Sequence, residues 1–155
     1  MKTAGNSAVA NEELQQFVTF TLNNEEYAVD ILNVQEINRV TEITRVPNSP
    51  DYVEGVINLR GKVIPVVNLR KKFNFEEKPT DDTSRIIIME IHGITNGVIV
   101  DSVSEVLRVP KSIIDPPPPM SADFSNTFIK GIAKMQDRLI ILIDIDKLIG
   151  GSVHL

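Results

Sequence analysis

Cysteine is absent from the 155-residue sequence. This absence excludes a disulfide framework, thiolate metal ligands and cysteine nucleophiles. Long apolar runs are missing too: the densest, LIILI at 139–143, is well short of the roughly 18 residues that suggest a membrane-spanning helix. The first residues, MKTAGNSAVANEEL, carry no apolar core of the kind found in secretory signals. We therefore expect a soluble protein of the cytoplasm with no segment inserted in a membrane.

A strongly basic surface is also lacking. The sequence has 16 lysine and arginine residues against 21 aspartate and glutamate residues, a formal net charge of −5. Nucleic-acid-binding proteins usually carry a basic face, because neutralising phosphates supplies much of their affinity. The densest basic cluster, Arg70-Lys71-Lys72, is short and more typical of a solvated helix face. We therefore expect no nucleic-acid partner.

Residues suited to catalysis are few and poorly placed. Of the two histidines, His92 lies in a predicted turn and His154 lies in the segment GGSVHL. Neither has a partner at metal-ligand spacing, and no nucleophile elbow or phosphate-binding loop is present. Asp81-Asp82 falls in a polar linker, and Asp144-x-Asp146 opens a predicted helix, where the helix dipole alone favours acidic residues. The sequence therefore predicts a protein that is not an enzyme and that binds neither a metal nor a cofactor.

What the sequence does contain is an internal repeat. The segments YVEGVINLRGKVIPVVNLRKKF (52–73) and FIKGIAKMQDRLIILIDIDKLI (128–149) align without a gap, and Gly55 coincides with Gly131. A repeat on this scale predicts two similar supersecondary units packed together. The other matching pairs are FVTFTLNNEEYAVD (17–30) with IIIMEIHGITNGVIVD (86–101), and EINRVTEITRVP (36–47) with EVLRVPKSIID (105–115).

Each unit has the pattern of β structure. Residues 17–22 alternate as in a half-buried strand, whereas the runs 63–67 and 139–143 do not alternate and are expected to be buried on both faces. Turn-forming residues at 23–24 and 93–97 predict hairpins. Helix is expected only in short pieces, which would begin after Asp30, at 49–54, after Asn68 and after Asp144.

We therefore predict an all-β fold with a few short helices. It consists of two pseudo-repeated, five-stranded SH3-like β-barrels, one per repeat, packed around a shared core. The four prolines at 116–119 predict a rigid spacer, with a ligand for a proline-reading domain as the alternative. The expected parts are a flexible tail (1–13), one domain (14–150) containing the first repeat (about 17–75), a linker (about 76–84) and the second repeat (about 85–149), and a flexible C-terminus (151–155).

Several strings, specific only in combination, resemble one known family. They are the Asp30-Ile-Leu-Asn-Val-Gln-Glu segment, the Asn58-Leu-Arg-Gly turn, Val100-Asp101-Ser-Val, and Asp137-Arg138-Leu139. Over residues 13–149 the sequence resembles the CheW family of chemotaxis coupling proteins and the related regulatory domain of the histidine kinase CheA. The resemblance implies the two-barrel fold and a non-enzymatic adaptor that joins methyl-accepting chemoreceptors to CheA. With no kinase or receiver segment in the sequence, the stand-alone adaptor matches better, monomeric when free and bound to membrane receptor arrays through its partners.

The resemblance also implies a receptor-binding groove between the barrels, which takes the tip of the receptor's helical hairpin. It places Ile31 and Val34 at this groove, with Val18 on the first strand and Val103 in the second half. Apolar anchors suit a helix that presents residues at i, i+3, i+4 and i+7. The alternative, that these four side chains belong to the core, stays open at this point.

Glu36 and Arg60 form the sharpest pair of candidates. The second repeat has Glu105 opposite Glu36 but Gln136 opposite Arg60, so the acid recurs whereas the cation belongs to one half only. We expect Arg60 to be exposed within reach of Glu36, with Glu36 facing the receptor and Arg60 facing the kinase. An exposed pair adds only about 0–1 kcal/mol to stability in general. Arg60→Ala is therefore expected to leave the melting temperature nearly unchanged while it weakens partner binding, unless Arg60 is an ordinary solvated arginine.

The remaining kinase-docking candidates are apolar residues of the first repeat, Ile43, Val46 and Leu59, each of which could equally be buried. Two other functions stay open. One is a scaffold of the same fold in another histidine-kinase pathway. The other is a regulatory domain that binds a small molecule in the cleft between the barrels.

Overall fold

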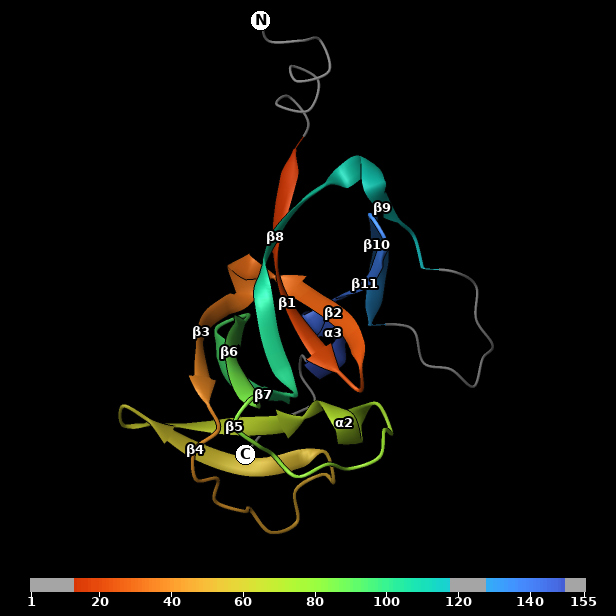
Figure 1. The fold of residues 1–155 in the computed structure, drawn as a ribbon. Coiled ribbons are helices and arrows are strands. Elements are labelled where there is room, and N and C mark those ends of the chain that lie inside the picture. The colour runs from red at the N-terminus through yellow and green to blue at the C-terminus, as the bar shows by residue number, and fades with distance from the viewer. Residues whose placement is uncertain (1–12, 118–127, 150–155) are drawn as a thin grey trace, which may run out of the picture.

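The computed structural model describes residues 13–117 and 128–149, and strands predominate in them (Figure 1). The strands are β1 (Leu14–Leu22), β2 (Glu25–Asp30), β3 (Val34–Arg39), β4 (Val53–Leu59), β5 (Lys62–Asn68), β6 (Arg85–Ile91), β7 (Ile94–Val100), β8 (Ser102–Pro110), β9 (Ile114–Asp115), β10 (Ile129–Met135) and β11 (Arg138–Ile143). The helical pieces are the 3₁₀ turns η1 (Ile31–Asn33) and η2 (Lys111–Ile113) and the helices α2 (Leu69–Lys72) and α3 (Ile145–Ile149). The predicted all-β class with a few short helices is confirmed. Prolines 118 and 119 of the proline run and both predicted tails, apart from Glu13, lie outside the described residues.

Polar side chains start two of the short helical pieces, as their chemistry predicts. At η1 the Asp30 Oδ1 accepts the Leu32 N–H at 2.9 Å. At α2 the Asn68 Oδ1 accepts the Arg70 N–H at 3.0 Å. Both residues satisfy backbone donors that the first turn leaves without a partner, so the sequence fixes where these turns begin.

The helix predicted at residues 49–54 does not form. The segment is a turn in which the Val53 N–H donates to the Pro50 carbonyl (3.0 Å), and β4 begins at Val53. Val53 is buried and stands opposite Val67 in the β4–β5 ladder. Pairing of two buried β-branched residues outweighs the weak helix-start signal of a single proline.

Each of the two sheets takes strands from both halves of the chain (Figure 1). Sheet A has the order β8-β1-β2-β11-β10-β9, and sheet B has the order β3-β6-β7-β5-β4. The prediction of one barrel per repeat is therefore wrong in its assignment of strands, and sheet A contains a sixth strand, the two-residue β9. The hairpin β1–β2 pairs with strands of the second half, and the hairpin β6–β7 pairs with strands of the first. Because the two hairpins have similar patterns, the sequence does not distinguish this exchange from pairing within each half.

The predicted repeat is nevertheless visible in the order of the strands. If β8, β1, β2, β11 and β10 are replaced by their repeat equivalents β3, β6, β7, β5 and β4, the order of sheet A becomes that of sheet B. The parallel pairs β2–β11 and β5–β7 occupy equivalent places. A register shift falls at Gly55 in one sheet and at Gly131 in the other. The two sheets thus share one strand order, and the two halves of the chain have exchanged their first hairpins.

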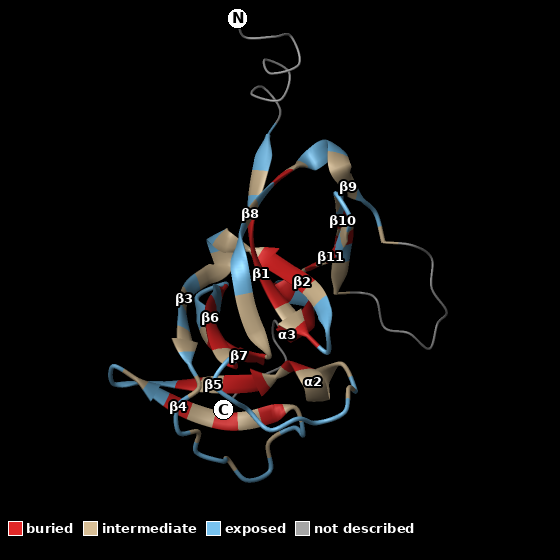
Figure 2. Cartoon of the chain, viewed as in Figure 1, coloured by how far each residue is buried: buried red, intermediate tan, exposed pale blue. Residues whose placement is uncertain are grey.

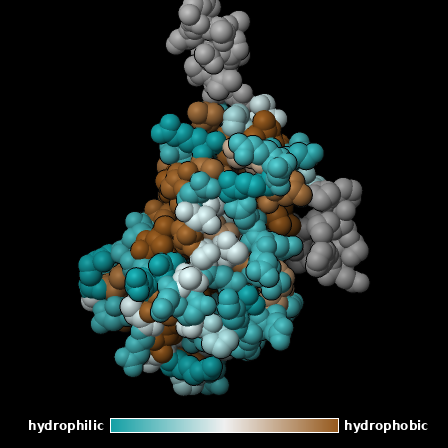
Figure 3. Space-filling model, viewed as in Figure 1, coloured by the Kyte–Doolittle hydropathy of each residue, from teal (hydrophilic) through white to brown (hydrophobic). Residues whose placement is uncertain are grey.

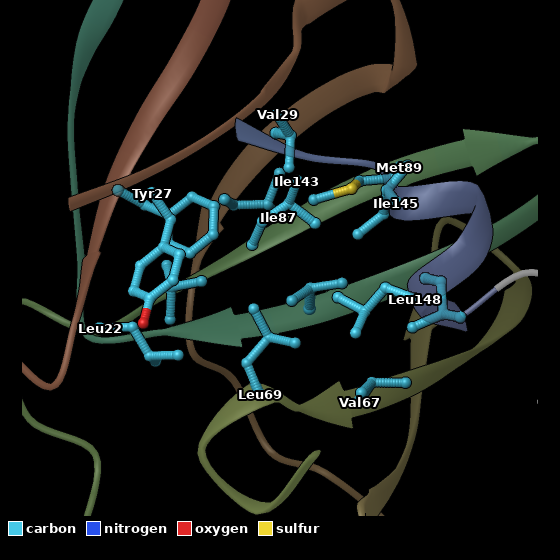
Figure 4. Close-up of a cluster of buried hydrophobic side chains, with 14 of the residues drawn as sticks. Leu22, Tyr27, Val29, Val67, Leu69, Ile87, Met89, Ile143, Ile145 and Leu148 are labelled. Carbon is cyan, nitrogen blue, oxygen red and sulfur yellow. The ribbon is translucent and has the colours of Figure 1, made fainter. Parts of the chain in front are cut away.

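One hydrophobic cluster, the shared core, receives side chains from both sheets and from α3 (Figure 4). Each fully buried large apolar side chain contributes roughly 1.5–3 kcal/mol to folding. This cluster therefore holds the sheets together, and Figure 2 shows the buried residues concentrated in the strands, with exposed residues at hairpin tips and loops. Among its members are Leu22, Tyr27, Val29 and Ile143 from sheet A, Val67, Ile87 and Met89 from sheet B, and Ile145 and Leu148 from α3.

β1 is buried on both faces, although its alternation predicts burial on one. Thr19 stands on the face opposite the shared core and is fully buried. Its Oγ1 donates to the Glu105 carbonyl (3.1 Å) and accepts the Glu105 N–H (3.2 Å). These bonds satisfy the β8 backbone where the β1–β8 register shifts between Thr19 and Phe20. The polar side chain of Thr19 thus supplies hydrogen bonds to the β8 backbone at an irregular point of the ladder.

An ion pair joins the two sheets beside the shared core. Arg70 of α2 donates from Nε and Nη2 to the two carboxylate oxygens of Asp101, at 3.0 and 2.7 Å. The same carboxylate accepts the Asn23 N–H (2.9 Å) from the β1–β2 turn. Burial acts to raise the pKa of Asp101, but the hydrogen bonds from Arg70 and Asn23 and the charge of Arg70 outweigh it, so the pKa lies below its ordinary value.

Acid is expected to weaken this ion pair. A carboxylate whose folded-state pKa is depressed stabilises the fold above its unfolded-state pKa, and this contribution is lost as the pH falls through the folded-state pKa. In urea titrations between about pH 7 and about pH 3, the free energy of unfolding should therefore fall less steeply for Asp101→Asn than for the parent chain. Asp82→Asn, in the exposed linker, is the matched control. Equal acid sensitivity of the Asp101 variant and the parent would contradict the assignment.

Gly55 lies where another segment of backbone crosses β4. A Cβ atom at this position would stand 2.2 Å from the Thr44 carbonyl oxygen and 2.8 Å from the Ile43 side chain. At the equivalent Gly131 it would stand 2.9 Å from the Asp115 carbonyl oxygen. Both glycines therefore permit a close backbone approach, in agreement with the prediction that they serve geometry.

Gly55→Ala is expected to destabilise the fold by about 2 kcal/mol or more, because backbone must move to admit the methyl group. Chemical denaturation measures the loss. Gly61→Ala is the control: it also has positive φ, at 87°, but no atom lies within 4 Å of its added Cβ. A loss at Gly55 no larger than the loss at Gly61 would show that the close contact has no cost.

Candidate partner-binding face

The shared core reaches the surface at the edge strands of the two sheets. β3 is one edge strand of sheet B and β8 is one edge strand of sheet A, and η1 contacts their neighbours β6 and β1. Val34 on β3 stands opposite Met89, and Val103 on β8 stands opposite Phe20. Residues opposite one another in a ladder share a face of the sheet. Val34 and Val103 therefore lie on the core-facing sides of the two sheets, at their edges.

We call this region the apolar face. Ile31, Val34 and Val103 are half-buried and pack on the shared core, so these three predicted groove residues keep contact with water. Leu32 is 88% exposed, although it stands in a one-turn helical piece beside them. Figure 3 shows hydrophobic surface at the level of η1 and β8. The members are Ile31, Leu32, Val34, Ile37, Val103 and Val106.

Val18 does not belong to the apolar face. Its side chain is 2% exposed and lies within the shared core. β8 pairs alongside β1 at this point, with Val106 directly opposite Val18. The sequence pattern places Val18 on the core-facing side of β1 but does not show that β8 lies beside it. Because Val18 is buried, the prediction that it contacts the receptor is not supported.

Sequence reasoning missed Leu32. A single leucine in a turn has no periodic neighbours, so neither the helical nor the strand pattern assigns it a face. The available signal was a second apolar residue, two positions after a capping aspartate, in the string Asp30-Ile-Leu-Asn. In the structure the Leu32 N–H donates to the Asp30 carboxylate, and the Leu32 side chain is exposed.

Glu36 and Arg60 form the predicted exposed ion pair. The Arg60 guanidinium donates to both carboxylate oxygens of Glu36, one of them at 3.4 Å from Nη1. The Arg60 side chain is 70% exposed and that of Glu36 is 27% exposed. The hydrogen bonds from Arg60 hold the pKa of Glu36 below its ordinary value. Arg60 occupies the β4–β5 turn, where it and Gly61 have positive φ, so the pair ties the tip of this hairpin to β3.

The expectation that only one half has such a cation is wrong. Arg138, at the start of β11, donates from Nη2 to Glu105 of β8 (2.9 Å) and to Glu26 of β2 (2.7 Å), and from Nε to Glu26 (2.9 Å). The hydrogen bonds from Arg138 lower the pKa of Glu26, against the opposing effect of burial. Arg138 is two residues beyond Gln136, so position-by-position matching of the repeats overlooked it. Each glutamate thus has an arginine, supplied from a different point of the hairpin.

The three other kinase-docking candidates lie around sheet B and are half-buried. Ile43 and Leu59 pack on the hydrophobic cluster inside sheet B. Val46 follows in the loop before β4, where its carbonyl accepts the Ser49 hydroxyl at 2.8 Å. All three therefore have structural contacts as well as exposed surface, and their role in docking stays a prediction.

Comparison with known proteins decides the family. The profile of the CheW-like domain matches residues 16–152. The chain belongs to the CheW family. It is 38% identical over 147 residues to the chemotaxis protein CheW of Klebsiella aerogenes, which covers 94% of this chain and 89% of that protein. It is 38% identical over 130 residues to CheW of Bacillus subtilis, with 84% and 83% covered. The crystal structure of the scaffolding protein TtCheW from Thermoanaerobacter tengcongensis superposes with a TM-score of 0.83 at 40% identity, covering 91% of this chain and 98% of that one.

Membership of the CheW family confirms the predicted resemblance and the fold class.

A polar hollow of about 470 Å³ lies away from the apolar face, between the loop that follows β3 and the linker. In residues 13–117 and 128–149 no group of three or more metal-ligating side chains comes together. Within the same residues, every helix is too short or too polar to cross a membrane. The hollow is lined by Val40, Thr41, Ile43, Arg45, Glu54, Asn68, Glu77, Lys78, Pro79, Thr80 and Ile99.

The two arginines are expected to differ in their effect on stability. Arg138→Ala removes a bridge between three strands and leaves Glu26 and Glu105 facing each other, so the free energy of unfolding should fall by roughly 1–2 kcal/mol. Arg60→Ala should leave the melting temperature nearly unchanged, because its pair is exposed. Thermal denaturation of both variants, with Arg108→Ala on β8 as the control, measures the difference. A larger loss for Arg60 than for Arg138 would contradict this assignment.

Proposed function

We propose that this chain is a non-enzymatic adaptor that couples methyl-accepting chemoreceptors to the histidine kinase CheA. Its membership of the CheW family supports the proposal. The observation that carries it is the apolar face, where a core shared by two sheets meets water along η1, β3 and β8. An apolar surface of this kind is typical of a docking site. The adaptor acts in the cytoplasm, is monomeric when free, and reaches the membrane through its receptors.

The receptor binds at the apolar face through the tip of its helical hairpin. Ile31, Val34 and Val103 are fixed on the shared core, so little side-chain freedom is lost when a partner covers them. Leu32 projects beyond them and is the candidate anchor, since it is the most exposed large apolar side chain among the described residues. Glu36, which the resemblance assigns to this contact, stands opposite Ile88 on the other side of β3 and pairs with Arg60. We therefore place it between the receptor and kinase surfaces and not among the apolar anchors.

The kinase binds at the end of sheet B that carries the β4–β5 turn. Arg60 is exposed at a hairpin tip, and arginine is enriched among the residues that dominate interface energies. Ile43 and Leu59 lie on the adjoining cluster and Val46 on the neighbouring loop. This arrangement leaves receptor and kinase surfaces on different sides of β3, so both partners can be bound together.

A small-molecule regulatory role is less well supported. The hollow beside the linker lies within the range of about 300–1,000 Å³ usual for ligand pockets, but such pockets are predominantly apolar. Its lining includes Arg45, Glu54, Glu77 and Lys78, and it lies on the outer side of sheet B rather than between the sheets. The adaptor function uses the apolar face, which this alternative leaves without a role.

Reconstitution with a receptor cytoplasmic fragment and CheA tests the proposed function. ATP-driven autophosphorylation of the kinase should come under receptor control only when this chain is present. Arg60→Ala should reduce that control while the chain stays folded. A kinase rate that is the same with and without this chain, at receptor concentrations that saturate, would reject the adaptor function. A scaffold for another histidine-kinase pathway would give that negative result with CheA but a positive one with its own kinase.

Leu32→Ser is expected to weaken receptor-fragment binding by about tenfold, because it removes an exposed anchor from the interface. The melting temperature should not change, since the Leu32 side chain is 88% exposed. Isothermal titration calorimetry measures the affinity. Ile94→Ser is the matched control, because Ile94 is an exposed apolar residue of β7 outside the apolar face. Equal affinities for the Leu32 variant and the parent would remove Leu32 from the contact.

A further inference from the structure

Two repeat-equivalent aspartates stand at the start of the two segments that form the apolar face. Asp30 ends β2 and precedes Ile31, and Asp101 follows β7 and stands two residues before Val103. Asp30 fixes its segment locally, since its carboxylate accepts the Leu32 N–H. Asp101 has no such local bond, and its carboxylate instead accepts from residues distant in the chain.

The Asp101 carboxylate is held from both sheets at once. From the sheet B side, Arg70 donates two hydrogen bonds through Nε and Nη2. From the sheet A side, the Asn23 N–H in the β1–β2 turn donates a third. The Asp101 backbone is also bonded to sheet A, because its N–H donates to the Thr21 carbonyl of β1 (3.1 Å). Asp101 therefore fixes the point at which the chain passes from sheet B to sheet A.

Arg70 is itself held rigidly. Its Nη1 donates to the Glu76 carbonyl at 2.6 Å, so three of its nitrogens are used. The linker returns to the same point, where the Thr83 hydroxyl donates to the Asp101 carbonyl (3.1 Å). The side chains of Arg70 and Asp101 are only 12% and 18% exposed. A two-pronged pair with this little exposure is stronger and geometrically stricter than a surface ion pair.

The equivalent point in the other half is held more weakly. Asp146 stands at the repeat position of Arg70, and it pairs with His92 in the β6–β7 turn at 3.0 Å. The His92 side chain is 74% exposed and that of Asp146 is 51% exposed, and the pair is ionic only when the histidine is protonated. Of the two equivalent joints, the one at Arg70 and Asp101 therefore fixes the sheets more firmly.

We infer that Arg70 and Asp101 are positioning residues for the partner-binding face. They hold the start of β8 against sheet B, and so set the distance between Val103 on β8 and Val34 on β3. A helical partner that contacts both strands requires this distance to stay within a narrow range. The inference rests on the proposed receptor contact but concerns residues that do not touch the receptor.

A distance measurement tests the joint without any partner. The sequence has no cysteine, so Gln35→Cys on β3 and Ser104→Cys on β8 introduce the only two labelling sites. Spin labels on this pair report the distance distribution between the strands by pulsed electron paramagnetic resonance. In Asp101→Asn the distribution should broaden or shift, because an NH₂ group replaces one of the two oxygens that accept from the guanidinium, and the charge is lost. Arg70→Lys keeps the charge but not the two-pronged geometry, and a smaller change in the same direction is expected.

Receptor binding supplies the second readout. Asp101→Asn should weaken receptor-fragment binding by about tenfold although the residue lies outside the contact. Leu32→Ser should weaken binding while it leaves the strand distance unchanged, which separates a contact residue from a positioning residue. If Asp101→Asn proves too unstable to measure, Arg70→Lys carries the same two readouts.

The outcomes separate this inference from the proposed function. A distance distribution in both the Asp101 and Arg70 variants identical to that of the parent would overturn the inference, whatever the receptor does. An altered distance with unchanged receptor affinity would also overturn it, because the joint would then have no effect on the contact. If the parent chain failed to bind the receptor fragment at all, the proposed receptor contact would fall and the positioning role with it, whereas the distance result would still describe the joint.

Discussion

The hydrophobic cluster shared by the two sheets is the constraint on which the rest of this structure depends. Each sheet is completed by a hairpin from the other half of the chain. The core between them is built from both sheets and from α3. The edge strands β3 and β8, which are repeat equivalents, therefore end up at the margin of one core rather than on two separate domains.

The proposed binding surface follows from this geometry without any additional helix or strand. A shared core has a margin where it meets water, and here the margin carries Ile31, Val34 and Val103 in half-buried positions. Because these side chains already pack on the core, they are ordered before a partner arrives, which lowers the entropy cost of binding. Charged side chains lie at the hairpin ends, where Arg60 binds Glu36 of β3 and Arg138 binds Glu26 of β2 and Glu105 of β8. The proposed recognition therefore divides into an apolar contact and separate polar ones.

The sequence predicted those features that depend on local chemistry. The turns started by Asp30 and Asn68 and the repeat that pairs Gly55 with Gly131 follow from residue types and spacing, and the structure contains them. The hairpin exchange could not be predicted, because equivalent hairpins offer the same pattern to either sheet and only long-range pairing decides between them. The burial of Val18 was missed for the same reason, since it depends on which strand lies beside β1.

Hydrogen exchange of the backbone amides, with and without a saturating receptor cytoplasmic fragment, tests the central claim most directly. If the margin of the shared core is the receptor-binding surface, exchange should slow at residues 31–34 and 102–106 and stay the same in β10, at the far side of sheet A. Slowed exchange confined to β10 and β11, with η1 and β8 unaffected, would contradict the account.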